Sequence, residues 1–189
     1  MARHSIDDVV EAAGRLFAER GFHGTSMRDL GAELGLLGSS LYSHVGSKQE
    51  LLLAVIEKGS RFFEQVADAA EAASGSAADR VAVFVHGHLD VVLDHRAEVR
   101  TFLNEARFLE PDDRSGAVAL RDAYEGRLRG LLREGMADGS FAEDLDVPLA
   151  SITVLSILNS VERWHRDTGR FGRGELAESL TKRVLALLQ

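Results

Sequence analysis

One segment near the N-terminus is rich in side chains that carry positive charge or can donate hydrogen bonds. Between residues 25 and 48 the chain holds several hydroxyl side chains, a tyrosine, a histidine and the cations Arg28 and Lys48. Cations, hydroxyl groups and backbone N–H groups make most protein contacts to phosphate. The chemistry expected of this segment is therefore non-covalent recognition of a phosphate backbone and of the base edges beside it.

The spacing of glycines predicts the elements that would position these side chains. Gly31 falls in the middle of a predicted helix, where a side chain would obstruct a closely packed partner helix. Gly35 follows four residues later, where a turn commonly needs positive φ. We expect two short helices, at about residues 26–35 and 39–45, packed at a steep angle as a helix-turn-helix. An ordinary helical hairpin has similar spacing, so the glycines alone leave that alternative open.

Helical periodicity continues along the whole chain, and no alternating strand pattern bounded by hairpin turns interrupts it. Capping residues such as Ser5, Ser26 and Ser47 mark helix starts, and Gly21 and Gly35 mark helix ends. We predict an all-α fold of about nine helices. Their expected ranges are 5–21, 26–35, 39–45, 47–69, 79–95, 99–109, 111–138, 148–168 and 175–188.

Composition limits the classes of function. The chain has 189 residues, 45% of them hydrophobic, no cysteine and a net charge of −8. Residues 1–58 hold six Lys/Arg against eight Asp/Glu, so DNA contact must come from local placement of a few donors and not from a general positive field. The first eight residues are polar and the apolar stretches are too short for a bilayer, which predicts a soluble, cytoplasmic protein without a membrane partner.

Residues 6–56 resemble the N-terminal domain of the tetracycline-repressor (TetR) family. The shared motifs are Phe17-Ala-Glu-Arg-Gly-Phe22, Gly24-Thr-Ser-Met-Arg-Asp-Leu30, Leu41-Tyr42, His44, Ser47-Lys48 and Glu50-Leu51. The resemblance implies a helix-turn-helix DNA-binding domain over residues 1–50, made of three helices. It also implies a helical ligand-binding and dimerisation domain over residues 51–189. The expected function is a homodimeric, ligand-responsive transcriptional repressor that binds a near-palindromic operator in duplex DNA.

The resemblance also assigns DNA-binding roles. The side chains expected at phosphate or base edges are Thr25, Ser26, Arg28, Ser39, Ser40, Tyr42, Ser43, His44 and Lys48. The expected recognition helix lacks Arg, Lys, Asn and Gln on its exposed face, so reading of the operator would rest on hydroxyls, water and DNA shape. Leu37 and Val45 depart from the family pattern. For Tyr42, packing of the ring in the core with its hydroxyl in contact with water is an open alternative.

The C-terminal part is similar, more weakly, to a TetR subgroup associated with acyl-CoA and lipid catabolism. The segments that carry this likeness are residues 102–111, 120–125 and 158–165. It implies a small effector, acyl-CoA-like or lipid-like, in a mostly apolar pocket between helices. Candidate pocket residues are Phe63, Phe84, His88, Phe102, Asn104, Arg107, Phe108, Arg121, Tyr124, Leu128 and Trp164. For each aromatic residue, ordinary core packing is the alternative.

The last two helices are the expected dimer interface. Leu176, Leu180, Val184 and Leu187 repeat at helical spacing, and the preceding helix has small and polar residues that allow close packing. Two helices from each chain would form a four-helix interface, as the family resemblance implies. Packing of these stripes inside one subunit is the alternative.

The sequence gives little support for metal binding or catalysis. His86 and His88 point to nearly opposite faces of one helix, so they cannot share a metal ion. We find no phosphate-binding glycine loop, no Ser-His-Asp arrangement and no paired carboxylates, so we expect neither an enzyme nor a cofactor nor a metal site. The competing function is an all-α protein-interaction dimer that kept a degenerate helix-turn-helix. Salt-dependent, sequence-specific binding of duplex DNA distinguishes the two.

Overall fold

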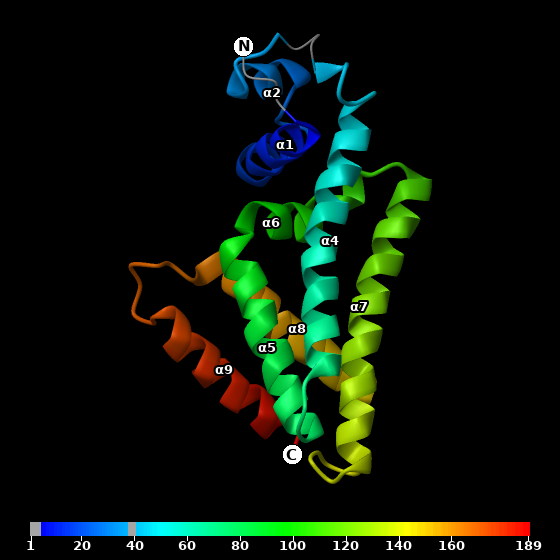
Figure 1. The fold of residues 1–189 in the computed structure, drawn as a ribbon, viewed down its shortest axis with the longest axis vertical. Helices are drawn as coiled ribbons and strands as arrows, with labels where there is room; N and C mark the ends of the chain where they lie inside the picture. The colour runs from blue at the N-terminus through cyan, green and yellow to red at the C-terminus, as the bar shows by residue number, and fades with distance from the viewer. Residues whose placement is uncertain (1–4, 38–40) are drawn as a thin grey trace. The chain divides into compact units, whose positions relative to one another are not determined.

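The structure, a computed structural model, describes residues 5–37 and 41–189. Within these ranges the chain forms eight α-helices, one 3-10 helix and no strand (Figure 1), which confirms the expected all-α fold. The ninth expected helix, at about residues 39–45, begins on residues that lie outside the described ranges. The helices are α1 (Ile6–Arg20), α2 (Met27–Glu33), α4 (Lys48–Ala72), α5 (Ala77–Asp94), α6 (Arg96–Asn104), η1 (Ala106–Phe108), α7 (Pro111–Ala137), α8 (Val147–Trp164) and α9 (Arg173–Leu187).

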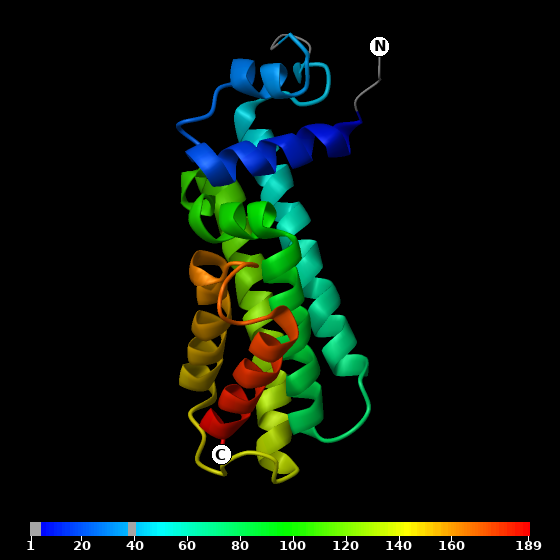
Figure 2. The ribbon, with the colours of Figure 1, turned by 90° about the vertical axis from the view of Figure 1, so that its left-hand side faces the viewer.

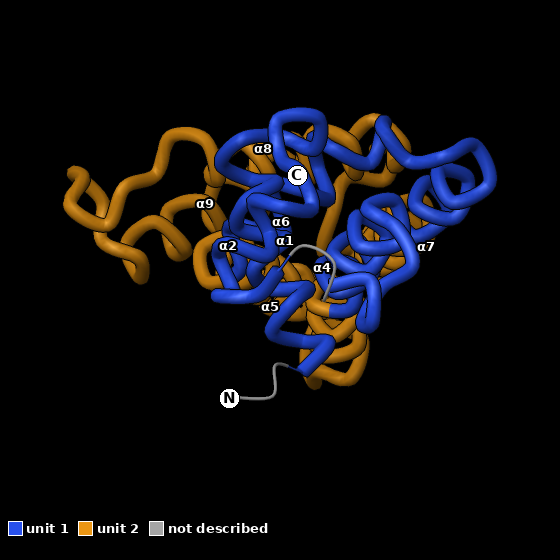
Figure 3. The backbone as a smooth tube through the Cα atoms, turned by 90° about the horizontal axis from the view of Figure 1, so that it is seen from above, with its two compact units in different colours: residues 1–61, 95–120 blue, residues 62–94, 121–189 orange. Residues whose placement is uncertain are grey.

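The chain forms two compact units (Figure 3). Unit 1 consists of residues 1–61 and 95–120, and unit 2 consists of residues 62–94 and 121–189. Helices α4 and α7 contribute residues to both units. The expected division of function between residues 1–50 and 51–189 stays a prediction. None of the described helices is both long and apolar enough to cross a membrane.

Unit 1 brings α1 against α6 and α2. The start of α1 follows the sequence prediction, because Ser5 caps the helix and forms a reciprocal capping box with Asp8. The helix ends at Gly21, which has a φ of 75°. The turn after α2 likewise contains Gly35 with a φ of 64°, as expected. The buried apolar residues of unit 1 include Val9, Leu16, Phe17, Leu30, Leu41, Leu51, Val55 and Phe102.

Unit 2 is organised around α5, which packs against α8 and α9 (Figure 2). Its buried apolar residues include Phe84, Leu89, Leu128, Leu132, Val154, Leu158, Leu176 and Val184. Leu176 and Val184 belong to the stripe expected at a dimer interface. Both are buried within one subunit, so for these two residues the structure agrees with the alternative, which is packing inside one subunit. Leu187 of the same stripe is 42% exposed.

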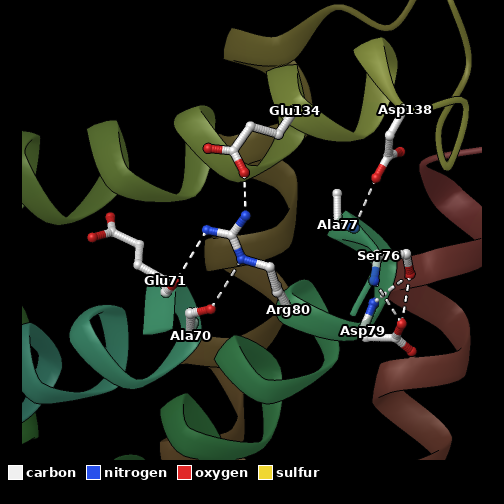
Figure 4. Close-up of polar contacts among 8 residues, drawn as sticks. All are labelled: Ala70, Glu71, Ser76, Ala77, Asp79, Arg80, Glu134 and Asp138. Atoms are coloured by element: carbon white, nitrogen blue, oxygen red, sulfur yellow. Dashed lines mark hydrogen bonds and ion pairs between the residues drawn. The ribbon is translucent and has the colours of Figure 1, made fainter. Parts of the chain in front are cut away.

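The junction between α4 and α5 is stabilised by side chains that satisfy helix ends (Figure 4). Arg80 donates hydrogen bonds to the carbonyl oxygens of Ala70 and Glu71 in the last turn of α4, and it forms an ion pair with Glu134 of α7. The carboxylate of Asp138 accepts a 3.0 Å hydrogen bond from the N–H of Ala77 in the first turn of α5. These contacts supply partners for backbone groups that a helix cannot satisfy internally.

Helix α8 ends four residues earlier than the sequence analysis predicts. The backbone becomes extended at His165, with φ −69° and ψ 138°. The His165 side chain is buried, and its Nε2 lies 3.3 Å from the carbonyl oxygen of Phe171. Residues 166–172 are therefore an exposed loop and not the last turn of the helix.

Gly135 in α7 lies very close to the ring of Phe141, in the loop that follows this helix. A Cβ atom on Gly135 would lie 2.0 Å from Cδ2 and 2.2 Å from Cε2 of Phe141, whose ring is buried. A Cβ atom on Gly126, in the same helix, would meet nothing within 4 Å. The two glycines therefore share a backbone conformation and differ in their surroundings.

We predict opposite effects of alanine at these two positions. Gly135→Ala should lower the free energy of unfolding by about 1–3 kcal/mol, because the Phe141 ring must leave its site. Gly126→Ala should raise it by up to about 1 kcal/mol, because alanine is the better helix former. Denaturant unfolding followed by circular dichroism measures both. Equal stabilities of the two variants would contradict the packing seen at Gly135.

Candidate functional site

The N-terminal end of α2 is built by local hydrogen bonds. Ser26 caps α2, accepting from the N–H of Asp29 at 3.1 Å, while its own N–H donates to the Asp29 carboxylate at 2.9 Å. The Ser26 hydroxyl also donates to this carboxylate, and that hydrogen bond is the main reason why the pKa of Asp29 is lowered. Ser26 is exposed, but its hydroxyl already has partners within α2.

The Thr25 side chain, expected at phosphate, does not lie at the surface. Its side chain is buried, and its hydroxyl donates to the carbonyl oxygens of Leu16 and Gly21 at 3.2 Å and 3.0 Å. The N–H of Thr25 donates to the carbonyl oxygen of Phe22. The hydroxyl expected at phosphate and the backbone N–H of Thr25 are therefore both used inside unit 1, where they hold the turn that follows α1.

The remaining expected DNA-binding residues differ in exposure. Arg28, Ser43 and His44 are exposed, and the Tyr42 side chain is 56% exposed, which excludes the alternative that Tyr42 packs in the core. Ser39 and Ser40 lie outside the described residues. The structure therefore presents Arg28 at one end of this segment and the polar residues 42–44 at the other.

Lys48 begins α4 and is half-buried. Its ammonium nitrogen lies 4.1 Å from the centroid of the Phe22 ring, a cation–π contact. Burial lowers the pKa of Lys48, and the nearby Asp29 carboxylate opposes that effect. The cation is thus held at a helix N-terminus, where the helix dipole also favours an anion.

Phe22 is the centre of an aromatic and polar cluster that the sequence analysis missed. Its ring lies edge-on to Phe17 at 5.6 Å and is stacked with Phe108 at 6.3 Å. Its N–H donates a buried 2.6 Å hydrogen bond to the carboxylate of Glu105, in the segment between α6 and η1. No local pattern signals this contact, because its two residues are 83 positions apart.

Part of the expected effector site comes together in unit 2. Nδ1 of His88 lies 3.0 Å from the Tyr124 hydroxyl, and Nε2 lies 3.2 Å from Oδ1 of Asn159. Phe63 stands against both rings, at 4.9 Å from His88 and 5.2 Å from Tyr124, and Phe84 is stacked on Tyr124 at 4.9 Å. These five residues, from α4, α5, α7 and α8, are called the His88 cluster below.

The His88 cluster is uncharged. Burial lowers the pKa of His88 to about 4, although the hydrogen bond to Asn159 opposes this shift. Burial also raises the pKa of Tyr124. Because Oδ1 of Asn159 can only accept, Nε2 of His88 carries the proton and Nδ1 accepts from the Tyr124 hydroxyl. The cluster thus satisfies its own polar groups, so core packing stays open as the alternative to a ligand site.

The other expected pocket residues are spread over the chain. Leu128 and Phe102 are buried, in unit 2 and unit 1 respectively. Burial lowers the pKa of Arg121, which is half-buried. Three of them are not buried, since Trp164 is 47% exposed and Asn104 and Arg107 are exposed in unit 1, so their place in an effector site stays a prediction.

These three side chains have local partners instead. Asn104 donates to the carbonyl oxygen of Arg100, Arg107 stands over the ring of Phe108, and Trp164 donates to Ser160. Helical periodicity did not reveal which face of each segment is covered.

Two surface grooves of unit 2 run beside α5. One has a volume of about 410 Å³ and is lined by α4 and α5, including Val66, Val83 and His86. The other has a volume of about 500 Å³ and lies between α5 and α9, including His86 and Thr181. Neither was anticipated as a binding site. Among the described residues, no group of three or more His, Asp and Glu side chains is arranged to hold a metal ion.

Two protein families match the chain in succession. Residues 9–55 match the family described as bacterial regulatory proteins, tetR family. Residues 74–188 match the family described as tetracyclin repressor-like, C-terminal domain. The first range contains most of α1, all of α2 and the start of α4, with the exposed residues Arg28, Tyr42 and His44.

Individual relatives cover nearly the whole chain. The HTH-type transcriptional repressor KstR2 of Mycolicibacterium smegmatis is 26% identical over 96% of this chain and 87% of its own. The crystal structure of the TetR family transcriptional regulator PfmR from Thermus thermophilus is 32% identical, with a TM-score of 0.86 over 94% of this chain and 97% of its own. The structure of AibR in complex with isovaleryl coenzyme A and operator DNA is 23% identical, with a TM-score of 0.85 over 97% of both chains.

The buried Glu105 contact yields a stability prediction. Glu105→Ala should lower the free energy of unfolding by about 1–3 kcal/mol, because the buried N–H of Phe22 loses its acceptor. Glu105→Gln should lose less, since its amide oxygen can still accept. Glu110→Ala, an exposed carboxylate nearby in sequence, is the matched control. Chemical denaturation measures all three, and equal effects of Glu105→Ala and Glu110→Ala would refute the assignment.

His88 makes the stability depend on pH. Its pKa is about 4 in the folded chain and near 6.5 when unfolded, so the unfolded chain binds the proton first as pH falls. The contribution of neutral His88 to the free energy of unfolding is therefore complete above pH 6.5. It is lost as the pH falls from 6.5 to 4, by up to roughly 3 kcal/mol. Wild type should lose more stability over this interval than His88→Gln, whereas His86→Gln, an exposed control on α5, should follow wild type. Parallel curves for wild type and His88→Gln in urea unfolding would contradict the prediction.

Proposed function

Because the chain belongs to the TetR family of transcriptional regulators, we propose that it is a homodimeric repressor which leaves its operator when a small effector binds. The observation that carries the proposal is the family match over residues 9–55, the range in which Arg28, Tyr42 and His44 are exposed. Family membership makes the chain a regulator and not an enzyme. Since its target is genomic DNA, we expect it to work in the cytoplasm.

The proposed DNA-binding face consists of Arg28, Ser39, Ser40, residues 42–44 and Lys48. Arg28 and Lys48 bind phosphate, and Tyr42 and His44 add hydroxyl and imidazole contacts to the backbone. In a two-fold dimer the two recognition helices would enter successive major grooves, about 34–36 Å apart. With so few cations and a net charge of −8, discrimination between sequences depends on hydroxyls, bridging water and the shape of the operator.

The proposed effector is acyl-CoA-like or lipid-like. AibR, a neighbour in fold, was solved with isovaleryl coenzyme A and operator DNA. In this chain the His88 cluster offers what such a site needs, namely aromatic walls with a few convergent polar groups. An acyl group entering there would displace aromatic packing and would require new polar partners for His88 and Tyr124.

The proposed coupling runs through α4. Residues 48–61 of this helix belong to unit 1 and residues 62–72 to unit 2, so one continuous helix carries both Lys48 and Phe63. An effector that binds one position of α4 more tightly than another shifts the population of the dimer towards that position. The shift changes the spacing of the two DNA-binding heads and so weakens operator binding.

We predict specific losses of operator affinity. Fluorescent duplexes from the intergenic DNA upstream of the gene are titrated with protein at several salt concentrations. Lys48→Met, which keeps the length of the side chain, should weaken binding about tenfold and reduce the salt slope by about 0.9, the contribution of one phosphate. Tyr42→Phe removes only the hydroxyl and should weaken binding with a smaller change of slope. Arg114→Ala, an exposed control on α7, should leave binding unchanged.

Three outcomes would overturn parts of this proposal. Wild-type affinity and salt slope in both variants would remove Lys48 and Tyr42 from the DNA-binding face. A stable dimer without specific DNA binding would favour the protein-interaction alternative.

A second experiment tests the effector: acyl-CoA thioesters of increasing chain length are added to the complex of the protein with its operator. A thioester that binds tightly and leaves operator affinity unchanged would contradict the coupling through α4.

A further inference from the structure

The groove between α5 and α9 contains a buried hydroxyl group without a partner. Thr181 of α9 lines this groove and is 8% exposed. Its hydroxyl oxygen has no hydrogen-bond partner within the described part of the chain. Thr153 of α8 shows the usual arrangement in a helix, since its hydroxyl donates to the carbonyl oxygen of Leu149, four residues earlier, at 2.8 Å. Burial of a hydroxyl without a hydrogen bond costs free energy, so a bound molecule that reaches Thr181 gains affinity there.

The two walls of this groove are held by contacts at both ends of α9. Arg173, the first residue of α9, forms ion pairs with Asp90 and Asp94 of α5. At the other end the carbonyl oxygen of Leu188 accepts a 3.0 Å hydrogen bond from the N–H of Ala142. Helix α9 packs against α5 between these contacts (Figure 2), so the groove is formed by the chain itself and needs no ligand to shape it.

The groove between α4 and α5 adjoins the groove between α5 and α9, because His86 lines both. The carboxylate in the lining of the α4–α5 groove, that of Asp90, is already paired with Arg173. Volumes of about 410 Å³ and 500 Å³ lie in the range of small-molecule sites. The lining of the α4–α5 groove is otherwise apolar or small, and it includes Val66, Ala69, Ala82, Val83 and Gly87. A polar end near Thr181 thus continues past His86 into an apolar end.

The charges at the polar end favour a neutral ligand head. Glu178 and Lys182 line the groove, are exposed, and lie four residues apart on α9, so they are neighbours on one helix face. An anionic head would gain from Lys182 what it loses to Glu178, and a cationic head would meet the reverse. A hydroxyl or amide head both donates and accepts, as do the Thr181 hydroxyl and the amide of Gln189, which also lines the groove.

We propose that the two adjoining grooves form a second small-molecule site. It takes an amphipathic molecule whose neutral hydroxyl or amide head binds Thr181 and whose apolar tail lies past His86 in the α4–α5 groove. The site is separate from the His88 cluster, because His86 and His88 lie on nearly opposite faces of α5. It therefore depends neither on the proposed effector nor on operator binding.

Four probes with one tail and different heads test the ligand class. Octanamide, octanol, octanoate and octylamine are titrated into the full chain, and the methyl NMR signals of Thr181 and Leu185 report binding in the groove. Octanamide and octanol should bind about tenfold more tightly than the charged probes, because a charged head gives up water without a net counter-charge. Butanamide should bind more weakly than octanamide, by about twofold for each methylene removed.

Thr181→Val should have two opposite effects. It should raise the urea midpoint of the free chain, because a buried hydroxyl without a partner is removed at nearly constant volume. It should also weaken octanamide binding about tenfold, the loss of one hydrogen bond. Thr153→Val, whose hydroxyl is bonded within α8, is the matched control and should neither raise the midpoint nor change octanamide binding. A lower midpoint for Thr181→Val would show that its hydroxyl is bonded within the chain, which would overturn the proposal.

Filling the groove from an exposed position tests its location. Ala186→Trp on α9 should abolish octanamide binding, whereas Ala123→Trp, exposed on α7, should leave it unchanged. Tyr124→Phe, in the His88 cluster, should also leave it unchanged. Circular dichroism verifies the fold of each variant.

Four results would overturn the second site. The first is a wild-type chain that binds none of the probes, and the second is tighter binding of octanoate or octylamine than of octanamide. The third is octanamide binding that is lost in Tyr124→Phe and kept in Ala186→Trp, which would place the probe in the His88 cluster. The fourth is binding that disappears as the protein dimerises, which would show that a second copy covers the groove. Each of these results leaves the proposed repressor function standing.

Discussion

The hydrogen bond from the N–H of Phe22 to the buried carboxylate of Glu105 is the contact on which the arrangement of unit 1 depends. It closes the turn that begins at Gly21 and keeps the Phe22 ring between Phe17 and Phe108. That position of the ring in turn determines where Lys48 can lie. A segment from the C-terminal half of the chain therefore shapes the region in which the proposed DNA-binding residues are found.

Most of the fold could be predicted because its signals are local. Ser5 and Gly21 mark the ends of α1 by capping and by positive φ, and neighbouring residues suffice to recognise both. The Phe22–Glu105 contact is set by tertiary packing between distant residues. The same reason explains Thr25, whose hydroxyl turned out to be buried, and Trp164, whose helix face is exposed. Periodicity identifies an apolar stripe, but not the neighbour that covers it.

The buried polar groups of unit 2 limit what the proposed effector must offer. His88 and Tyr124 are neutral and hydrogen-bonded to each other, so a ligand that separates them must supply an acceptor and a donor or leave buried groups unsatisfied. Asn159, the second partner of His88, lies on α8, one of the two helices expected at the dimer interface. One helix thus carries both a member of the His88 cluster and part of the expected interface, so a shift of α8 would change both.

The composition of unit 1 has a consequence for building chimeric regulators. A cut at residue 50, the expected end of the DNA-binding domain, is the simplest way to exchange heads between relatives. In this chain such a cut separates Phe22 from Glu105, because residues 95–120 belong to the same compact unit as residues 1–61. A transplanted head therefore needs either the segment around Glu105 from the same parent or a recipient with a carboxylate at the equivalent place.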